Sequence, residues 1–260
     1  MALQTAVEES AMRVHPASGR RLPAAARVGR VRLAVLGVEG RLARLGAHGG
    51  AEVLLELEEL PGVRAIGRRT RLGLYHTAIL LPDREALYLT DPDGLTVEVY
   101  ADRPRSEWRY EGRELVIGTE PLRFAELPQV ADDSWKGAPA GTTIGHVHLY
   151  VGEMGEASRF YHEALGFDVM SWRYPGAKFL SAGGYHHHLG MNVWAAGSPP
   201  ASQADARMLF WELVFPTAAE RDEAAERMRM AGYRGVETAV DAPCFADDWG
   251  IVVALVAAAE

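Results

Sequence analysis

The stretch IGHVHLYVGEMGEASRFYHEALGF, residues 144–167, decides the fold class. Its first part alternates apolar and polar residues up to Val151, which is typical of a half-buried β-strand. Its second part ends at Gly166, where a helix C-cap belongs, and carries apolar residues at helical spacing. These are Met154, Ala157, Phe160, Tyr161, Ala164 and Leu165. The stretch therefore predicts a strand that is followed directly by an amphipathic helix.

Three other segments read as the same kind of first strand. They are GRVRLAVLGVE from Gly29, LYHTAILLPD from Leu74 and LFWELVFPTA from Leu209. A second helical pattern follows the last of them and stops at Gly232. Later strands repeat as well, because DPDGLTVEVYA resembles DDWGIVVALVA, and GGYHHHLGMNV occupies the same place in the third unit. Repeats of this kind predict an α+β fold of four βαβββ modules with open, curved mixed sheets.

The repeats also suggest boundaries along the chain. We expect an N-terminal extension at 1–24, a first domain at 25–103, a polar connector at 104–140 and a second domain at 141–260. Only six residues separate the two strands of the second module, so its helix is expected to be missing. In the first module, GRLARLGA at 40–47 leaves room for one or two helical turns.

Composition narrows the class of protein. With 48% hydrophobic and 24% charged residues, the chain is that of a globular protein. A net charge of −8 argues against nucleic acid or an anionic membrane as partner. Cys244 is the only cysteine, so any transition metal must be held by histidines and carboxylates. The N-terminus lacks the order of a signal peptide and no apolar run is long enough to span a bilayer, which predicts a cytoplasmic protein.

Residues that can bind metal occur at equivalent positions of the two middle modules. His76 lies six residues before Pro82, at the place that Phe210 takes before Pro216, and His146 stands five before Val151. Glu98 lies four residues after Gly94, whereas Ala254 lies four after Gly250. In the first module, Arg30 takes the first-strand position of His76 and His146 if GRVRL is matched to GHVHL.

Two imidazoles and one carboxylate on one face, with open positions, form a site for divalent iron or manganese. His76, Glu98 and His146 supply that set, so we expect the second and third modules to pair around a metal cleft. The first and fourth modules would form an inert half. For each residue alone, a core histidine or an edge carboxylate explains the sequence as well, and the joint pattern carries the prediction.

The module order, IGHVHLYVGEMGEASRFYHEALGF and YLTDPDGLTVEVYADRP together resemble the vicinal oxygen chelate superfamily, and within it the two-domain catechol 2,3-dioxygenases. The resemblance covers about residues 25–260, with a shortened N-terminal domain. It implies Fe(II) at His76, Glu98 and His146, with Mn(II), Zn(II) or Ni(II) as alternatives. It also implies a catechol-like aromatic substrate and O2.

The same resemblance suggests roles for further residues. His187 in YHHHLGMN is the best match to an acid-base histidine, with His186 or His188 as alternatives, and Tyr88 matches a tyrosine beside the substrate oxygen. His148 shares a face with His146 and would line the substrate pocket or orient a ligand. His188 is a second candidate for binding substrate. One further histidine of the family has no counterpart in PDREALY, residues 82–88.

Three functions remain open at this point. The first is an extradiol ring-cleaving dioxygenase, and the second is a glyoxalase-like lyase or isomerase, in which a fourth protein ligand such as His188 would be expected. The third is a small-molecule binding or resistance protein that has lost catalysis. The shortened sheet also predicts a homo-oligomer, because a partner subunit would cover its exposed apolar faces.

Overall fold

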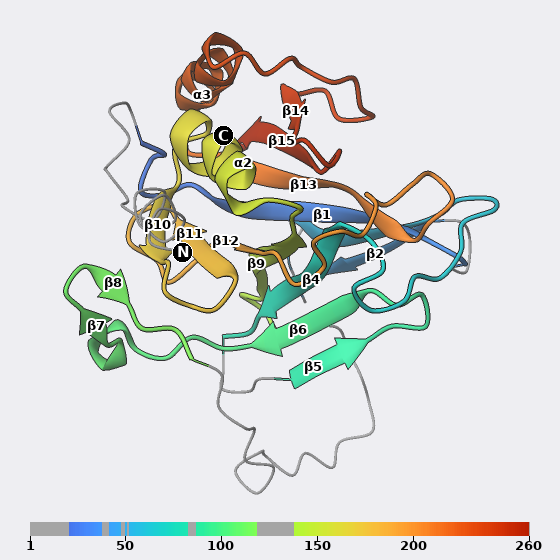
Figure 1. Ribbon diagram of the computed structural model, residues 1–260, viewed down its shortest axis with the longest axis horizontal. Helices are drawn as coiled ribbons and strands as arrows, with labels where there is room; N and C mark the ends of the chain where they lie inside the picture. Colours follow the sequence, from blue (N-terminus) through green and yellow to red (C-terminus); the bar gives the residue numbers. More distant parts are fainter. Residues whose placement is uncertain are drawn as a thin grey trace, which may run out of the picture.

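The computed structural model describes residues 21–37, 42–47, 50, 52–82, 87–118 and 138–259. Two large mixed sheets dominate it, with strand orders β14-β15-β13-β1-β3-β2 and β10-β11-β12-β9-β4-β6-β5 (Figure 1). Each sheet combines strands from both halves of the chain. The second and third modules share the seven-stranded sheet and the first and fourth share the six-stranded one, as predicted. The exact domain boundaries stay a prediction.

The seven-stranded sheet contains β4 (Gly73–Leu80), β5 (Leu87–Thr90), β6 (Thr96–Tyr100), β9 (Thr143–Tyr150), β10 (Asp168–Ser171), β11 (Ala177–Ser181) and β12 (Leu189–Asn192). The six-stranded sheet contains β1 (Arg27–Val35), β2 (Leu42–Gly46), β3 (Val53–Glu59), β13 (Arg207–Phe215), β14 (Cys244–Ala246) and β15 (Val252–Ala257). A short hairpin of β7 (Tyr110–Glu111) and β8 (Glu114–Leu115) follows the 3₁₀ turn η1 (Arg105–Glu107).

The helices occur where the repeats predict them. The third module has α2 (Met154–Ser158), which continues as the π-helix η3 (Arg159–Ala164), and the fourth has α3 (Ala218–Met230). Gly166 and Gly232 follow them with φ of 101° and 94°, a left-handed conformation that favours glycine at a helix end. Helix α3 packs on β13 and β15, on the side of the molecule opposite β5 and β6 (Figure 1).

One local expectation was wrong. Residues 42–46 form strand β2, which pairs antiparallel with β3, and do not form helical turns. Between β4 and β5 the described residues contain no helix, in line with the missing helix of the second module, although 83–86 lie outside the described part of the chain. None of the helices in the described ranges is long and apolar enough to cross a bilayer.

The alternation of side chains along the strands separates the core from the site. Val147 and Leu149 of β9 join the main core together with Val31 of β1 and Trp211 of β13. His146 and His148 point to the other face of the same strand because successive side chains alternate. The seven-stranded sheet therefore presents one apolar face to the core and one histidine-bearing face to the candidate site.

Candidate metal centre

Strand pairing brings the predicted ligands together around Ala78. In the antiparallel pair β4–β9, His76 lies opposite His148 and Ala78 lies opposite His146. In the parallel pair β4–β6, Ala78 lies opposite Glu98. Residues directly opposite each other on neighbouring strands have their side chains on the same face. Three strands from two modules thus direct two imidazoles and one carboxylate to one place.

The ligand atoms converge closely. His76 Nε2 lies 3.0 Å from His146 Nε2, and Glu98 Oε2 lies 3.1 Å and 3.0 Å from these two nitrogens. The side chains of His76 and His146 are 4% and 2% exposed, and that of Glu98 is 12% exposed. Hydrogen bonds within the group cannot satisfy all three contacts, because two N–H groups 3.0 Å apart would repel, and a nitrogen that carries a lone pair cannot donate to the ionised carboxylate.

The spacing suits a divalent metal ion. Donor atoms bound at right angles to one ion at about 2.1 Å are about 3.0 Å apart, which is the spacing of a facial two-histidine, one-carboxylate set. Within the described residues these three form the only group of at least three such side chains with mutually close ligand atoms. His76, Glu98 and His146 therefore fit a divalent metal and leave further coordination positions for substrate.

The protonation states also suit metal binding. Burial alone would raise the pKa of Glu98, but the hydrogen bonds and charges of His146 and His76 outweigh it, so this pKa is lowered. Burial lowers the pKa of His146 to about 4 although the Glu98 carboxylate opposes that shift. An ionised carboxylate and a neutral imidazole are the forms that bind metal.

A chain of hydrogen bonds fixes the tautomer of His146. Tyr185 donates its only hydroxyl proton to Asp102 Oδ1 at 2.9 Å, so Tyr100 must donate to the Tyr185 oxygen at 2.8 Å. The Tyr100 oxygen then accepts from His146 Nδ1, which lies 3.3 Å away. A proton on Nδ1 leaves the lone pair on His146 Nε2, the atom that faces His76 and Glu98.

A second chain from Asp102 fixes His187. His186 Nε2 donates to Asp102 Oδ1 at 2.8 Å, and in a neutral His186 the lone pair is then on Nδ1. His187 Nδ1 lies 2.7 Å from that atom and must be the donor. His187 Nε2 is left with a lone pair, and the His187 ring lies 4.0 Å from the ring of His146. Burial holds the pKa of His187 well below its usual value.

His188 points elsewhere. Its Nδ1 accepts a hydrogen bond from the Ala182 backbone at 3.2 Å, and its ring packs on Tyr185 at 4.8 Å. It is not among the converging ligand atoms. Two of the three consecutive histidines, His186 and His187, therefore connect to the metal centre and the third does not.

His148 lies beside the centre on an aromatic wall. Its ring centroid is 4.9 Å from His76, and Asn192 Nδ2 donates to its Nε2 at 2.9 Å. The Trp194 backbone donates to the Asn192 oxygen, which fixes the orientation of the amide. The rings of Tyr75, Phe179 and Trp194 lie 5.1, 5.6 and 5.9 Å from His148. This wall offers apolar faces to a flat ligand.

Tyr88 completes the group from the edge strand. It lies opposite Glu98 in the β5–β6 pair, its hydroxyl is hydrogen-bonded to the Glu98 carboxylate, and its ring is 5.6 Å from His76. The side chain is 52% exposed. The structure thus places five predicted residues, His76, Glu98, His146, His148 and Tyr88, on one face of one sheet.

Sequence reasoning did not find the residues that orient the ligands. Tyr100 could have been found, because it stands two residues after Glu98 and shares its face of β6. Asp102 and Tyr185 gave no signal, since they meet only through the packing of two loops. The aromatic wall likewise joins residues from β4, β11 and the segment after β12.

These features define a class of protein: repeated βαβββ modules that carry one two-histidine, one-glutamate divalent metal site on one of two sheets. Residues 143–252 match the Glyoxalase/Bleomycin resistance protein/Dioxygenase superfamily. A catechol-2,3-dioxygenase of Bacillus subtilis (strain 168) is 41% identical, over 78% of this chain and 81% of its own length. The chain belongs to this superfamily.

Solved structures agree on the fold. A Bacillus subtilis protein provisionally described as a dioxygenase superposes with a TM-score of 0.52 at 12% identity, over 88% of this chain and 77% of that one. A glyoxalase I variant from Zea mays superposes with a TM-score of 0.50 at 16% identity, over 90% and 92%. At such identities the likeness concerns the fold alone.

Proposed function

We propose that this protein is an extradiol ring-cleaving dioxygenase that acts on a catechol-like aromatic compound with O2. The observation that carries the proposal is the convergence of His76, His146 and Glu98, with both orientation chains ending on Asp102. The 41% identity to a catechol-2,3-dioxygenase supports the reaction class. Fe(II) is the proposed metal.

Each residue of the centre has a proposed task. When bound, Fe(II) would supply Lewis acidity to the two ring hydroxyls and a path for electrons from the aromatic ring to O2. His76, His146 and Glu98 would hold it with two imidazoles and one carboxylate. Tyr100 keeps the proton of His146 on Nδ1, so the metal-facing nitrogen stays free to bind.

His187 is the proposed acid-base group. Its Nε2 carries the lone pair, and its ring packs on His146, so a substrate hydroxyl at the metal would lie beside a base. His186 Nδ1 accepts the hydrogen bond from His187 Nδ1, and Asp102 accepts the one from His186 Nε2. These two bonds keep the proton of His187 on Nδ1, so its tautomer stays the same between turnovers. Because burial holds the pKa of His187 well below its usual value, its imidazole is neutral and able to accept a proton.

Tyr88 and His148 are the proposed substrate contacts on either side of the metal ligands. The Tyr88 hydroxyl is hydrogen-bonded to the Glu98 carboxylate, and it would hydrogen-bond a substrate hydroxyl on that side of the centre. His148 lies between His76 and the ring of Trp194 and would meet the edge of an aromatic substrate. The aromatic wall would shield the substrate from water on that side.

A glyoxalase-like lyase is less well supported. That function would call for a fourth protein ligand, and the candidate His188 faces the Ala182 backbone instead of the metal centre. A binding protein without catalysis would not need the two orientation chains. The missing helix and histidine of the second module remain the features that favour a reduced activity.

The direct experiment is turnover of catechol under air after anaerobic loading with Fe(II). We expect a coloured ring-opened product, and we expect His187→Asn to retain iron and to lose turnover at least about a hundredfold. Trp108→Phe serves as control, because its ring lies near His186 but touches no metal ligand. Full turnover by His187→Asn would move the proton-transfer role to another group.

We also propose a homo-oligomer. The edge strand β5 exposes Tyr88 and Leu89 at 52% and 51%, and an exposed apolar edge is commonly covered by a partner. Light scattering of the purified chain would show a dimer or larger species, and a monomer at working concentration would contradict this.

A further inference from the structure

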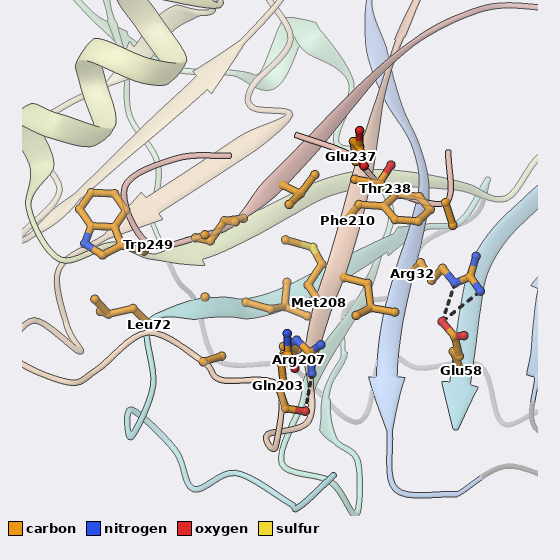
Figure 2. Close-up of a pocket in the computed structure, with 18 residues that line it drawn as sticks. Arg32, Glu58, Leu72, Gln203, Arg207, Met208, Phe210, Glu237, Thr238 and Trp249 are labelled. Atoms are coloured by element: carbon orange, nitrogen blue, oxygen red, sulfur yellow. Dashed lines mark hydrogen bonds and ion pairs between the residues drawn. The ribbon is translucent and has the colours of Figure 1, made fainter. Parts of the chain in front are cut away.

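A cavity lies on the six-stranded sheet, in the half of the molecule that has no metal ligands. Its volume is about 500 Å³, which is enough for one small organic molecule. Figure 2 shows Phe210 and Met208 of β13 in its middle, with Trp249 and Leu72 on one side. It also adjoins Leu74 at the start of β4, two residues before His76.

Among the described residues of this half, no group of side chains with converging metal-ligand atoms occurs. Phe210 and Ala254 stand where the sequence repeats place His76 and Glu98. The place that matches His146 is occupied by Arg30, whose guanidinium pairs with Glu212 at 2.6 Å and with Glu56 at 3.3 Å. Phe210, Ala254 and the ion-paired Arg30 thus take the positions of the metal ligands. The cavity beside them is open for another kind of ligand.

The polar groups of the cavity differ in how well they are paired. Arg32 is held by Glu58 at 3.0 Å (Figure 2). Arg207 donates from Nη1 to the backbone carbonyls of Gln203 and Asp205 at 3.0 and 3.2 Å, and within the described part of the chain it pairs with no carboxylate. Burial lowers the pKa of Arg207, and the charge of Asp205 opposes that shift only in part.

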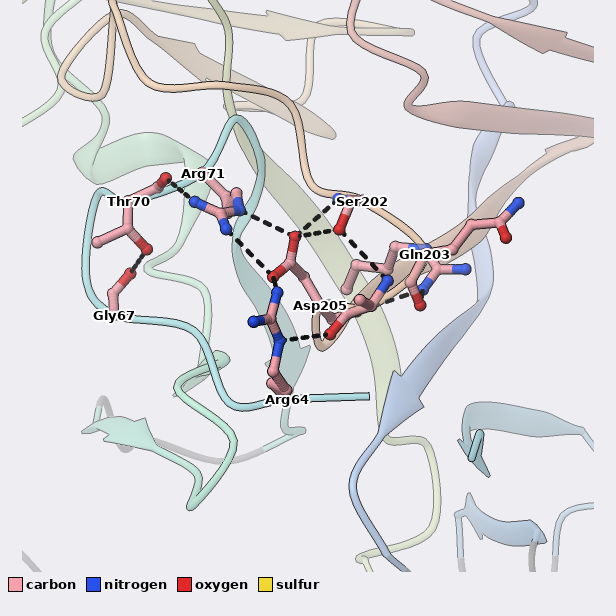
Figure 3. Close-up of polar contacts among 9 residues, drawn as sticks. Arg64, Gly67, Thr70, Arg71, Ser202, Gln203 and Asp205 are labelled. Atoms are coloured by element: carbon pink, nitrogen blue, oxygen red, sulfur yellow. Dashed lines mark hydrogen bonds and ion pairs between the residues drawn. The ribbon is translucent and has the colours of Figure 1, made fainter. Parts of the chain in front are cut away.

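The Asp205 carboxylate acts on Arg207 through its charge, but its hydrogen bonds go to other groups. Asp205 accepts from Arg71 Nε and Nη2 at 2.9 and 3.3 Å and from the Ser202 backbone and hydroxyl at 2.9 and 2.7 Å (Figure 3). Its side chain is 4% exposed. A guanidinium has five donors in a planar fork that matches a carboxylate, and most of those of Arg207 remain for a ligand.

We propose that this cavity binds a small aromatic or unsaturated monocarboxylate, with its flat apolar part against Met208, Phe210 and Trp249 and its carboxylate at Arg207. Aromatic rings and a thioether suit a flat conjugated group. Of the other charged side chains in the lining, Arg32 and Glu58 pair with each other and Glu237 is exposed, which leaves the Arg207 guanidinium for one negative charge. Binding is independent of the metal and of the proposed ring cleavage.

The test is isothermal titration of the full chain with sodium cinnamate. We expect one binding site, at least about tenfold weaker in Arg207→Gln and for the uncharged isostere cinnamamide, since a charge-assisted pair is lost in both cases. Arg64→Gln is the matched control, because Arg64 contacts Asp205 at 3.7 Å from outside the cavity. It should bind cinnamate within about twofold of the unchanged protein.

Two further variants keep the result decisive if Arg207→Gln folds poorly. Ala239→Trp places an indole in the cavity from an exposed position and should abolish binding. Glu98→Ala should bind cinnamate unchanged, which separates this site from the metal centre. No binding by the unchanged protein, equal loss in Arg64→Gln and Arg207→Gln, or loss in Glu98→Ala would each overturn the proposal.

Discussion

Replacing Tyr100 with Phe tests how the protein orients the proposed metal ligand His146. The change removes one hydroxyl and keeps the ring, which is 7% exposed. His146 Nδ1 then loses its partner at 3.3 Å, and the chain through Tyr185 to Asp102 is interrupted at its first step. Partners that orient a metal-bound histidine are typically worth about 10- to 100-fold in metal affinity, or about 1.4–2.7 kcal/mol.

The assay is an anaerobic competition titration of the apo-protein with Fe(II) and a coloured chelator. Tyr185→Phe should weaken binding less, since the Tyr100 hydroxyl remains against His146. Tyr110→Phe, at a 50% exposed position on β7, should have no effect. If Tyr100→Phe binds Fe(II) within about twofold of the unchanged protein and melts at the same temperature, the orientation chain has no role in metal binding.

Three other changes follow from the structure. Gly190→Ala should weaken catechol binding and turnover, because a Cβ there would lie 2.7 Å from the ring of His148, and unchanged kinetics would contradict this contact. Asp205→Asn should lower the free energy of urea unfolding by about 1–3 kcal/mol, against less than about 0.5 kcal/mol for Glu226→Gln in an exposed ion pair. Burial lowers the pKa of His188 to about 3, so the unfolded chain takes up its proton near pH 6.5 and the folded chain does not. The free energy of unfolding therefore falls as pH falls. His188→Asn should reduce the slope of this free energy against pH by about 1.4 kcal/mol per pH unit between about pH 6 and about pH 4. An unchanged slope would show that His188 is not buried in its neutral form.

The convergence of His76, Glu98 and His146 could be predicted because the repeats preserve positions along strands. His76 and His146 occupy matching places in the first strands of their modules, and strand pairing converts matching places into proximity. The same logic placed Phe210 and Ala254 in the half without metal. Which modules pair was also readable, because only the second and third hold residues that can bind metal.

The error at β2 has a physical reason. Leu42 and Leu45 are three residues apart, which suits one side of a short helix as well as a strand. Pairing with β3 decides the outcome, since tertiary contacts override weak local preference in so short a segment. No sequence pattern within residues 40–47 indicates that β3 is available as a partner strand.

The network around Asp102 could not be read from the sequence at all. Asp102 follows β6, whereas Tyr185 and His186 belong to the turn before β12, and the two segments are more than 80 residues apart. The direction of the hydrogen bonds in this network depends on which atom donates at each step. Only coordinates show that Tyr185 and His186 share one carboxylate oxygen and thereby set the tautomers of His146 and His187.

The most direct test of the metal centre is the metal content of anaerobically reconstituted protein after removal of unbound ions. Our interpretation predicts one Fe(II) per chain for the unchanged protein and almost none for Glu98→Ala, with both proteins folded by circular dichroism. One equivalent of iron retained by Glu98→Ala, or none bound by the unchanged protein, would contradict it.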